Sequence, residues 1–114
     1  ISEEDFSLMG QKLNINETTK NWASNALSAG ATSLVCSAFE VGQLRKLSNS
    51  AVLITPGVRV ESDDVGDQAR VMTPKDALSE GADFVVIGRS ITGMWDGTDM
   101  KMRKKIEQIA TTLG

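Results

Sequence analysis

The sequence contains no histidine, and its only cysteine is Cys36. Without histidine, a Ser-His or Cys-His catalytic pair is excluded, as is any His-ligated metal site. A single cysteine can form neither an intrachain disulfide nor a cysteine-only zinc cluster. Because no base lies near Cys36 in the sequence, we expect a small buried thiol at this position rather than a nucleophile.

Long apolar runs are also missing. No run approaches the ~18 residues needed to span a bilayer, and from the composition of its first residues we expect no signal peptide there. The net charge of −3 argues against a nucleic-acid-binding surface. The 114 residues, 40% hydrophobic and 24% charged, suit one small globular domain. We therefore expect a cytoplasmic protein, and, since the chain starts with Ile1 rather than Met, we expect that start to be a cut inside a longer protein.

Three short apolar runs predict β-strands, at residues 32–37, 51–54 and 83–87. Helical segments separate them, and this alternation predicts parallel pairing with right-handed crossovers. Continuous apolar runs are typical of strands that are covered on both faces of the sheet. The sequence thus indicates an α/β protein with helices on both sides.

Helices are predicted over residues 2–9, from Asn16 or Thr18 to Ala29, over 40–47, from Thr73-Pro74 to Gly81, and around 101–113. In the second of these, Trp22 recurs at helical spacing with three other apolar residues, so we expect core packing for it rather than base stacking. The spacing of apolar residues predicts the buried faces, which comprise Trp22, Ala23, Ala26 and Leu27, then Val41, Leu44 and Leu47, then Met102, Ile106, Ile109, Ala110 and Leu113.

The final helix also carries a basic run, residues 101 and 103–105. We expect this run to be the solvated face of the helix rather than a contact with nucleic acid or membrane.

A segment of roughly twenty residues, 55–74, has neither a helical nor a strand period. Loops of this length are uncommon in compact domains and are usually functional or disordered. Arg59 and Gln68 within it suit a pocket that binds an anion. Three acids in the loop, Asp63, Asp64 and Asp67, raise the question of a metal, but their spacing matches no standard calcium loop. We expect no metal here.

Four ordered motifs extend from Leu34 to Thr92: LVCSA followed by Glu40, then TPGVR, GDQARVMTP and VVIGRSIT. Together they closely resemble the C-terminal part of orotidine 5'-phosphate decarboxylase in its bacterial form. The resemblance implies the C-terminal portion of a TIM (β/α)8 barrel, with strands six to eight and their flanking helices. Residues 1–114 would form a single partial-barrel domain, and the first thirty residues match less specifically.

The resemblance also implies the site. Gln68 and Arg89 correspond to phosphate contacts, Arg59 belongs to the ligand-binding set, and Gly88 lets the backbone approach the phosphate. Bacterial members often have proline where this chain has Ser90, which relaxes the backbone of Arg89 and restores an N–H. The implied ligands are orotidine 5'-monophosphate and UMP, with no cofactor.

Decarboxylation in the resembled family uses an array of aspartates and lysines with the motif D-x-K-x-x-D, and this sequence has no such motif. We therefore assign no catalytic residue and expect the chain alone to be inactive. Ser2 would lie near the loop after the fifth strand, without a firm alignment.

Two other functions stay open. One is the phosphate-binding part of another sugar-phosphate lyase of the same barrel superfamily. The other is a module without catalysis that self-associates, because an open parallel sheet exposes strand edges and apolar surface. The family resemblance implies a homodimer for the intact protein.

Overall fold

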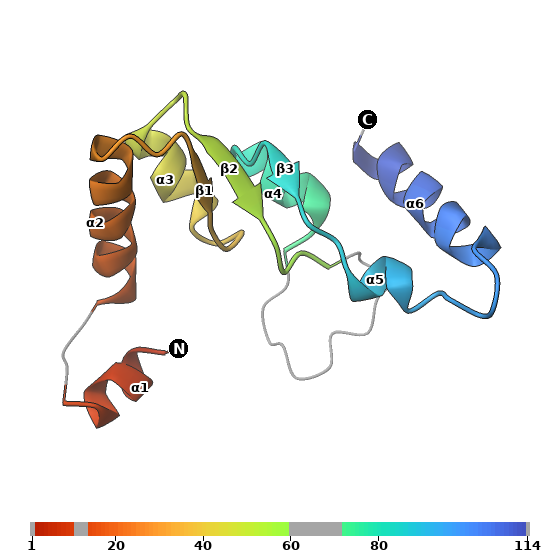
Figure 1. Ribbon diagram of the computed structural model, residues 1–114, viewed down its shortest axis with the longest axis horizontal. Helices are drawn as coiled ribbons and strands as arrows, with labels where there is room; N and C mark the ends of the chain where they lie inside the picture. The colour runs from red at the N-terminus through yellow and green to blue at the C-terminus, as the bar shows by residue number, and fades with distance from the viewer. Residues whose placement is uncertain (1, 11–13, 60–71, 114) are drawn as a thin grey trace.

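A computed structural model describes residues 2–10, 14–59 and 72–113, with the side chain of residue 6 left aside. Strands and helices alternate along the middle of the chain (Figure 1). The elements are α1 (Glu3–Leu8), α2 (Ile15–Ser28), β1 (Ser33–Val35), α3 (Val41–Leu47), β2 (Val52–Thr55), α4 (Pro74–Glu80), β3 (Phe84–Val85), α5 (Arg89–Thr92) and α6 (Met100–Leu113).

The strands form one parallel sheet in the order β1-β2-β3, which confirms the predicted pairing. In the register of the sheet, Leu34 faces Leu53 and Ile54 faces Phe84. β1 and β3 are shorter than the apolar runs that predicted them, whereas β2 has the predicted length but lies one residue later. Among the described residues, one edge of β1 and one edge of β3 have no neighbouring strand.

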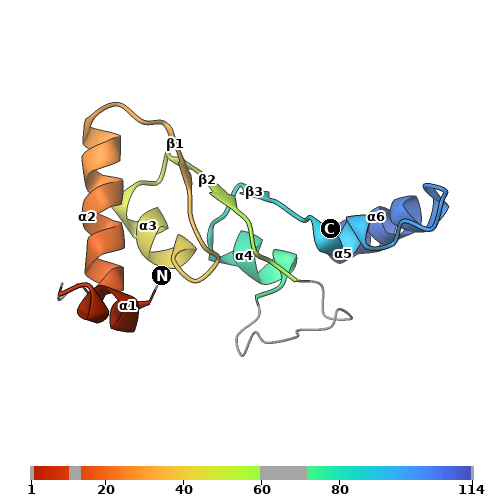
Figure 2. The ribbon, with the colours of Figure 1, turned by 60° about the horizontal axis from the view of Figure 1, so that its bottom comes forward.

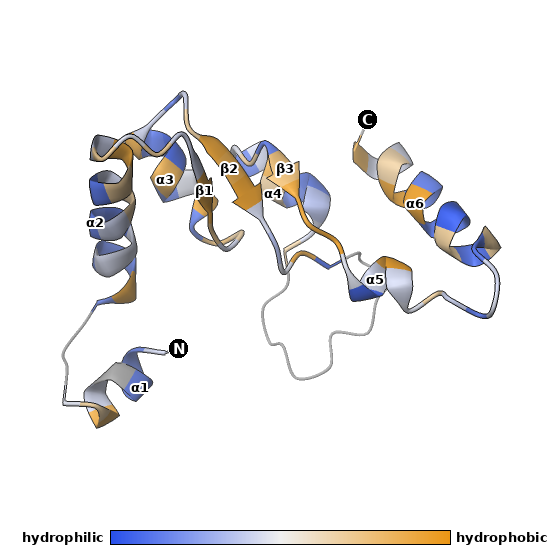
Figure 3. Ribbon diagram, viewed as in Figure 1, coloured by the Kyte–Doolittle hydropathy of each residue, from blue (hydrophilic) through white to orange (hydrophobic). Residues whose placement is uncertain are grey.

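The core lies between the sheet and the helices that follow β1 and β2. Val41 of α3, Leu53 of β2 and Ala77 of α4 are fully buried. The opposite face of the sheet is open, since Val35 is 71% exposed and Phe84 is 61% exposed. The prediction that both faces are covered is therefore wrong for the part of the chain that the structure describes. The strands are mostly apolar (Figure 3), but the described residues supply a cover for one face alone.

The molecule is elongated. Its principal dimensions are 47 × 35 × 21 Å and its radius of gyration is 16.4 Å. A compact chain of this length would have a radius of gyration of about 13 Å. The helices α5 and α6 lie at one end, away from α1 and α2 at the other (Figure 2).

Side-chain caps set the starts of three helices. The Ser2 hydroxyl accepts a hydrogen bond from the Asp5 backbone N–H, and the Asp5 carboxylate accepts one from the Ser2 N–H, which caps the first helix. The second helix begins earlier than predicted, because Asn14 rather than Asn16 or Thr18 caps it through the Glu17 N–H.

The start and end of α4 agree with the prediction. The Thr73 hydroxyl accepts from the Asp76 N–H, and Pro74 occupies the first turn, where a missing N–H costs nothing. Gly81 ends the helix with a φ of +122°, a conformation that favours glycine.

Several predicted buried positions prove to be exposed. Trp22 is 67% exposed, so the prediction that it packs in the core is wrong, although Ala23 on the same helix is buried. Leu47, the last residue of α3, is also exposed.

The buried and exposed residues of α6 also differ from the prediction. Ile109 is buried as expected, whereas Ile106 and Ala110 are exposed. Lys105, predicted on the solvated face, is only 8% exposed. The rest of the basic run is exposed, and two of its members pair with acids: Lys101 with Asp96 and Arg103 with Asp99.

Arg45 joins the amino-terminal side of the sheet to the ends of two helices. Its guanidinium donates to the backbone oxygens of Ala51 and Gly81, each at 2.7 Å, and to the Asp83 carboxylate at 2.7 Å. Asp83 also accepts a hydrogen bond from the Leu53 backbone N–H at 2.9 Å. These bonds fix the starts of β2 and β3 beside the end of α3.

Candidate functional site

The carboxyl ends of β2 and β3 lie side by side. The Val86 N–H, just after β3, donates to the Thr55 oxygen at the end of β2 with a distance of 2.9 Å. Carboxyl ends of parallel strands meet at the same edge of a sheet, so the segments that follow them start from one place. Arg59 follows β2 by four residues and Gly88 follows β3 by three.

The two ends of the long loop after β2 are held together. The Arg59 N–H donates to the Met72 oxygen at 3.1 Å, and the neighbouring Val58 is buried in the core. Gly57 has a φ of +79°, which turns the chain before this contact. The backbone of Arg59 is therefore fixed next to the sheet, while its side chain is half-buried.

The other residues that the sequence singles out in this loop, Gln68 and the acids Asp63, Asp64 and Asp67, lie outside the described residues. In the part of the chain that the structure does describe, no group of three or more acidic or cysteine side chains is placed to hold a metal ion.

Gly88 and Arg89 form the start of a short helix, α5, that the sequence analysis did not predict. The N–H groups of Ile91 and Thr92 donate to the Gly88 oxygen at 2.9 and 3.0 Å. A side chain at Gly88 would meet no atom within 4 Å, so packing among the described residues does not require glycine. The backbone at Gly88 is exposed and is not covered by any side chain of its own.

Arg89 is exposed, and none of the ion pairs among the described residues includes it. No carboxylate among the described residues therefore occupies its guanidinium, which can bind an anion. Arg89 occupies the first position of the α5 helix, a conformation that a proline at the next position would disfavour. Ser90, which is buried, permits it.

Thr55 and Cys36 lie beneath this edge, at the ends of β2 and β1. Both are buried, which confirms the prediction of a buried thiol. Burial raises the pKa of the Cys36 thiol, and the neighbouring Thr55 hydroxyl offsets only part of the rise. The Thr55 hydroxyl makes no hydrogen bond of ordinary geometry to another described residue. The contact between the Thr55 and Cys36 side chains is therefore not counted as a hydrogen bond. A threonine at the end of a strand carries no distinguishing pattern, so the buried position of Thr55 could not be identified from the sequence.

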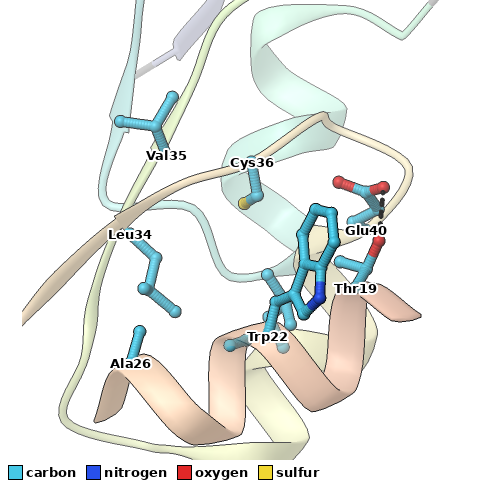
Figure 4. Close-up of a pocket in the computed structure, with 9 residues that line it drawn as sticks. Thr19, Trp22, Ala26, Leu34, Val35, Cys36 and Glu40 are labelled. Carbon is cyan, nitrogen blue, oxygen red and sulfur yellow. Dashed lines mark hydrogen bonds between the residues drawn. The ribbon is translucent and has the colours of Figure 1, made fainter. Parts of the chain in front are cut away.

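A separate hollow of about 360 Å³ lies between α2 and β1 (Figure 4). The Glu40 carboxylate at its side accepts hydrogen bonds from the Thr19 hydroxyl at 3.3 Å and the Ser37 N–H at 3.1 Å. Since both carboxylate oxygens are engaged, Glu40 fixes the turn after β1 against α2. Trp22 forms one wall of the hollow and is the exposed residue that sequence periodicity had assigned to the core.

Comparison with known proteins places these features in a family. Residues 1–99 match the family described as "Orotidine 5'-phosphate decarboxylase / HUMPS family". A crystal structure of orotidine 5'-phosphate decarboxylase from Lactobacillus acidophilus superposes with a TM-score of 0.73 at 25% identity, covering 100% of this chain and 44% of that one.

Curated relatives agree. The orotidine 5'-phosphate decarboxylase of Coxiella burnetii (strain RSA 493 / Nine Mile phase I) is 43% identical over 97 residues, which are 84% of this chain and 41% of the relative. That of Aliivibrio fischeri (strain ATCC 700601 / ES114) is 40% identical over 93 residues, 81% of this chain and 40% of the relative. The chain thus spans about two fifths of the length of these relatives.

The parallel three-stranded sheet, its alternating helices and the match over residues 1–99 lead to one assignment. The fold is the C-terminal portion of a TIM barrel, and this chain belongs to the orotidine 5'-phosphate decarboxylase / HUMPS family.

Proposed function

We propose that this chain is the phosphate-binding part of an orotidine 5'-phosphate decarboxylase, an enzyme of pyrimidine biosynthesis that converts orotidine 5'-monophosphate to UMP and CO2. The observation that carries the proposal is the position of Gly88-Arg89 at the start of a short helix, two residues after Val86, whose N–H donates to Thr55 at the end of β2. In TIM barrels a phosphate is frequently held by the loops after strands seven and eight together with the N-terminus of a short extra helix. Here β2, β3 and α5 correspond to these parts.

The proposed roles follow from the residue types. The open backbone at Gly88 brings N–H groups to the phosphate oxygens, and the guanidinium of Arg89 pairs with two of those oxygens at once. Arg59 adds a second permanent positive charge from the end of β2. Gln68 donates through its amide without adding charge.

Phosphate binding is expected to increase the rate of decarboxylation as well as the affinity for the substrate. The phosphate does not react, but binding energy from a remote group can orient the reacting centre and drive loop closure. The aspartate and lysine array that the family resemblance implies for the chemical step is absent here, since the sequence contains no D-x-K-x-x-D motif. The chain alone is therefore expected to be inactive, and the proposed reaction involves neither a metal nor an organic cofactor.

A fusion protein tests this proposal. The part of the Coxiella burnetii relative that precedes the matched region is joined to Ile1 of this chain, and decarboxylation of orotidine 5'-monophosphate is followed by absorbance. We expect activity from the fusion. Arg89→Ala should raise KM by about ten- to a hundred-fold, the range expected for losing a charge-assisted hydrogen bond.

Arg103→Ala is the matched control, because Arg103 is an exposed arginine on α6 whose ion pair is with Asp99, four residues before it in the sequence. A fusion that folds by circular dichroism but leaves the substrate unchanged would refute the proposed activity. Equal KM values for the two arginine variants would refute the role of Arg89.

We also propose that the intact protein is a cytoplasmic homodimer and that the isolated chain self-associates. No helix in the described part of the chain is long and apolar enough to cross a membrane. Self-association is supported by Val35 and Phe84 on the open face of the sheet, which remain exposed in a single copy. Light scattering over a wide concentration range measures it, and a monomer at every concentration would contradict it.

A further inference from the structure

The linker between α5 and α6 contains the one Asp-Gly pair of the sequence, Asp96-Gly97 (Figure 1). We propose that this pair is a modification site at which Asp96 isomerises to isoaspartate without an enzyme, and that the hydroxyl of Thr98 slows the reaction in the folded chain. The proposal concerns this linker alone and does not depend on the proposed phosphate site.

The reaction rearranges one peptide bond. The backbone nitrogen of Gly97 attacks the side-chain carboxyl carbon of Asp96, and a succinimide ring forms as the N–H proton and the carboxyl OH leave together as water. A water molecule then adds to the backbone carbonyl carbon of Asp96 and breaks its bond to the ring nitrogen. The main chain now runs through the Asp96 side chain and is longer by one methylene group. One water leaves and one enters, so no co-reactant is required.

The backbone at Gly97 leaves room for this attack. Gly97 has a φ of +101°, and no atom lies within 4 Å of the position that a Cβ would occupy there. A side chain on the attacking residue would hinder its nitrogen from reaching the carboxyl carbon, and glycine has none. Residues 96–99 are exposed and lie between the two helices, so the ring can form without unfolding either helix.

Hydrogen bonds restrain the Asp96 carboxylate. Its Oδ1 accepts from the Thr98 N–H at 3.3 Å and from the Thr98 hydroxyl at 3.1 Å, and its Oδ2 lies 3.4 Å from the Lys101 ammonium. The attack requires a protonated carboxyl group that has left these partners. The bonds from Thr98, and then Lys101, lower the pKa of Asp96 and so favour the ionised, unreactive form. Since exposed ion pairs contribute little, we assign the main effect to Thr98.

Asp99 in the same linker provides an internal comparison. Its carboxylate accepts from the Arg103 guanidinium at 2.7 Å, and the residue that follows it, Met100, is the first of α6. The helical backbone fixes the Met100 nitrogen, and the Met100 side chain hinders its approach to the carboxyl carbon. We therefore expect isoaspartate at Asp96 and not at Asp99.

The test incubates the folded chain at pH 6 and measures isoaspartate at each aspartate by peptide mapping and mass spectrometry. Thr98→Val keeps the shape of the side chain and removes the hydroxyl, so the rate at Asp96 should rise about two- to tenfold, the range for one hydrogen bond. Thr98→Ser retains a hydroxyl and should restore the slow rate. Thr111→Val is the matched control, because the Thr111 hydroxyl donates to the Glu107 oxygen on α6 instead.

The same incubation in guanidinium chloride separates the sequence from the structure. The unfolded chain lacks the bonds from Thr98, so Asp96 should isomerise faster than in the folded chain, and Thr98→Val should no longer differ from Thr111→Val. If the folded chain has formed no isoaspartate at Asp96 by the time the unfolded chain has converted completely, or has formed it at Asp99 instead, the proposed site is wrong. Equal rates for Thr98→Val and Thr111→Val in the folded chain would overturn the role of Thr98.

Discussion

Arg45 provides the sharpest test of how this open fold is held together. Its side chain is 22% exposed and donates to the backbone oxygens of Ser48, Asn49, Ala51 and Gly81 and to the carboxylate of Asp83. Replacing it with methionine keeps the aliphatic packing against α3 and removes all of these bonds. The backbone oxygens of Ala51 and Gly81 are part-buried, so water replaces the guanidinium poorly there.

The size of the effect can be estimated from these two bonds. A hydrogen bond to a charged group contributes about 1.5 to 3 kcal/mol, and the two short part-buried ones together give about 3 kcal/mol at the lower end of that range. The pair with Asp83 adds little, because the Asp83 side chain is 44% exposed and exposed pairs contribute close to nothing. For a chain of this length the unfolding entropy is about 0.24 kcal/mol/K. A loss of about 3 kcal/mol should therefore lower the thermal unfolding midpoint of Arg45→Met by about 12 °C.

Thermal unfolding followed by circular dichroism measures this change. Lys46→Met is the matched control, since Lys46 is the next residue on the same helix and is exposed. We expect the control to shift the midpoint by less than about 2 °C, as is usual for exposed positions. If Arg45→Met unfolds within about 2 °C of the unmodified chain, the reasoning that these backbone oxygens depend on Arg45 is wrong.

Two further predictions concern single hydrogen bonds. The pKa of Asp83 is lowered, first by the Leu53 N–H and then by Arg45, so its stabilising contribution is present above the unfolded pKa of about 3.9 and is lost as pH falls through the lower folded value. Urea midpoints of Asp83→Asn should therefore lie below those of the unmodified chain at pH 6 and converge with them near pH 2; a difference independent of pH would contradict this. Thr73→Ala should cost about 1 kcal/mol in urea unfolding through the lost α4 cap, whereas Ser79→Ala, exposed in the same helix, should not. Equal losses for these two variants would show that the cap does not stabilise α4.

Local features of the fold could be predicted from the sequence because their causes are local. The apolar runs located all three strands, and Thr73, Pro74 and Gly81 marked the ends of α4 through capping, fixed φ and positive φ. The motif around Gly88-Arg89 indicated the segment after β3, but the helix α5 was missed. Four residues are too few to show a helical period.

What covers an apolar residue could not be predicted in the same way. Periodicity indicates which residues share a face, and it assigned Trp22 correctly to the same side of α2 as the buried Ala23. It does not indicate whether another element lies against that side. Trp22 and Val35 are exposed because the described residues place no strand beside β1. Lys105 is the reverse case, a charged residue that tertiary packing buries against its local pattern.

The most direct test of the central claim, that Gly88 and Arg89 bind the phosphate of the ligand, is an NMR titration of this chain with UMP, with uridine as the control. The account predicts that UMP shifts the backbone amides of Gly88 and Arg89, that uridine does not, and that Arg89→Ala abolishes the shift while Arg103→Ala retains it. Equal responses to UMP and uridine, or no response at these two amides in the folded chain, would contradict it.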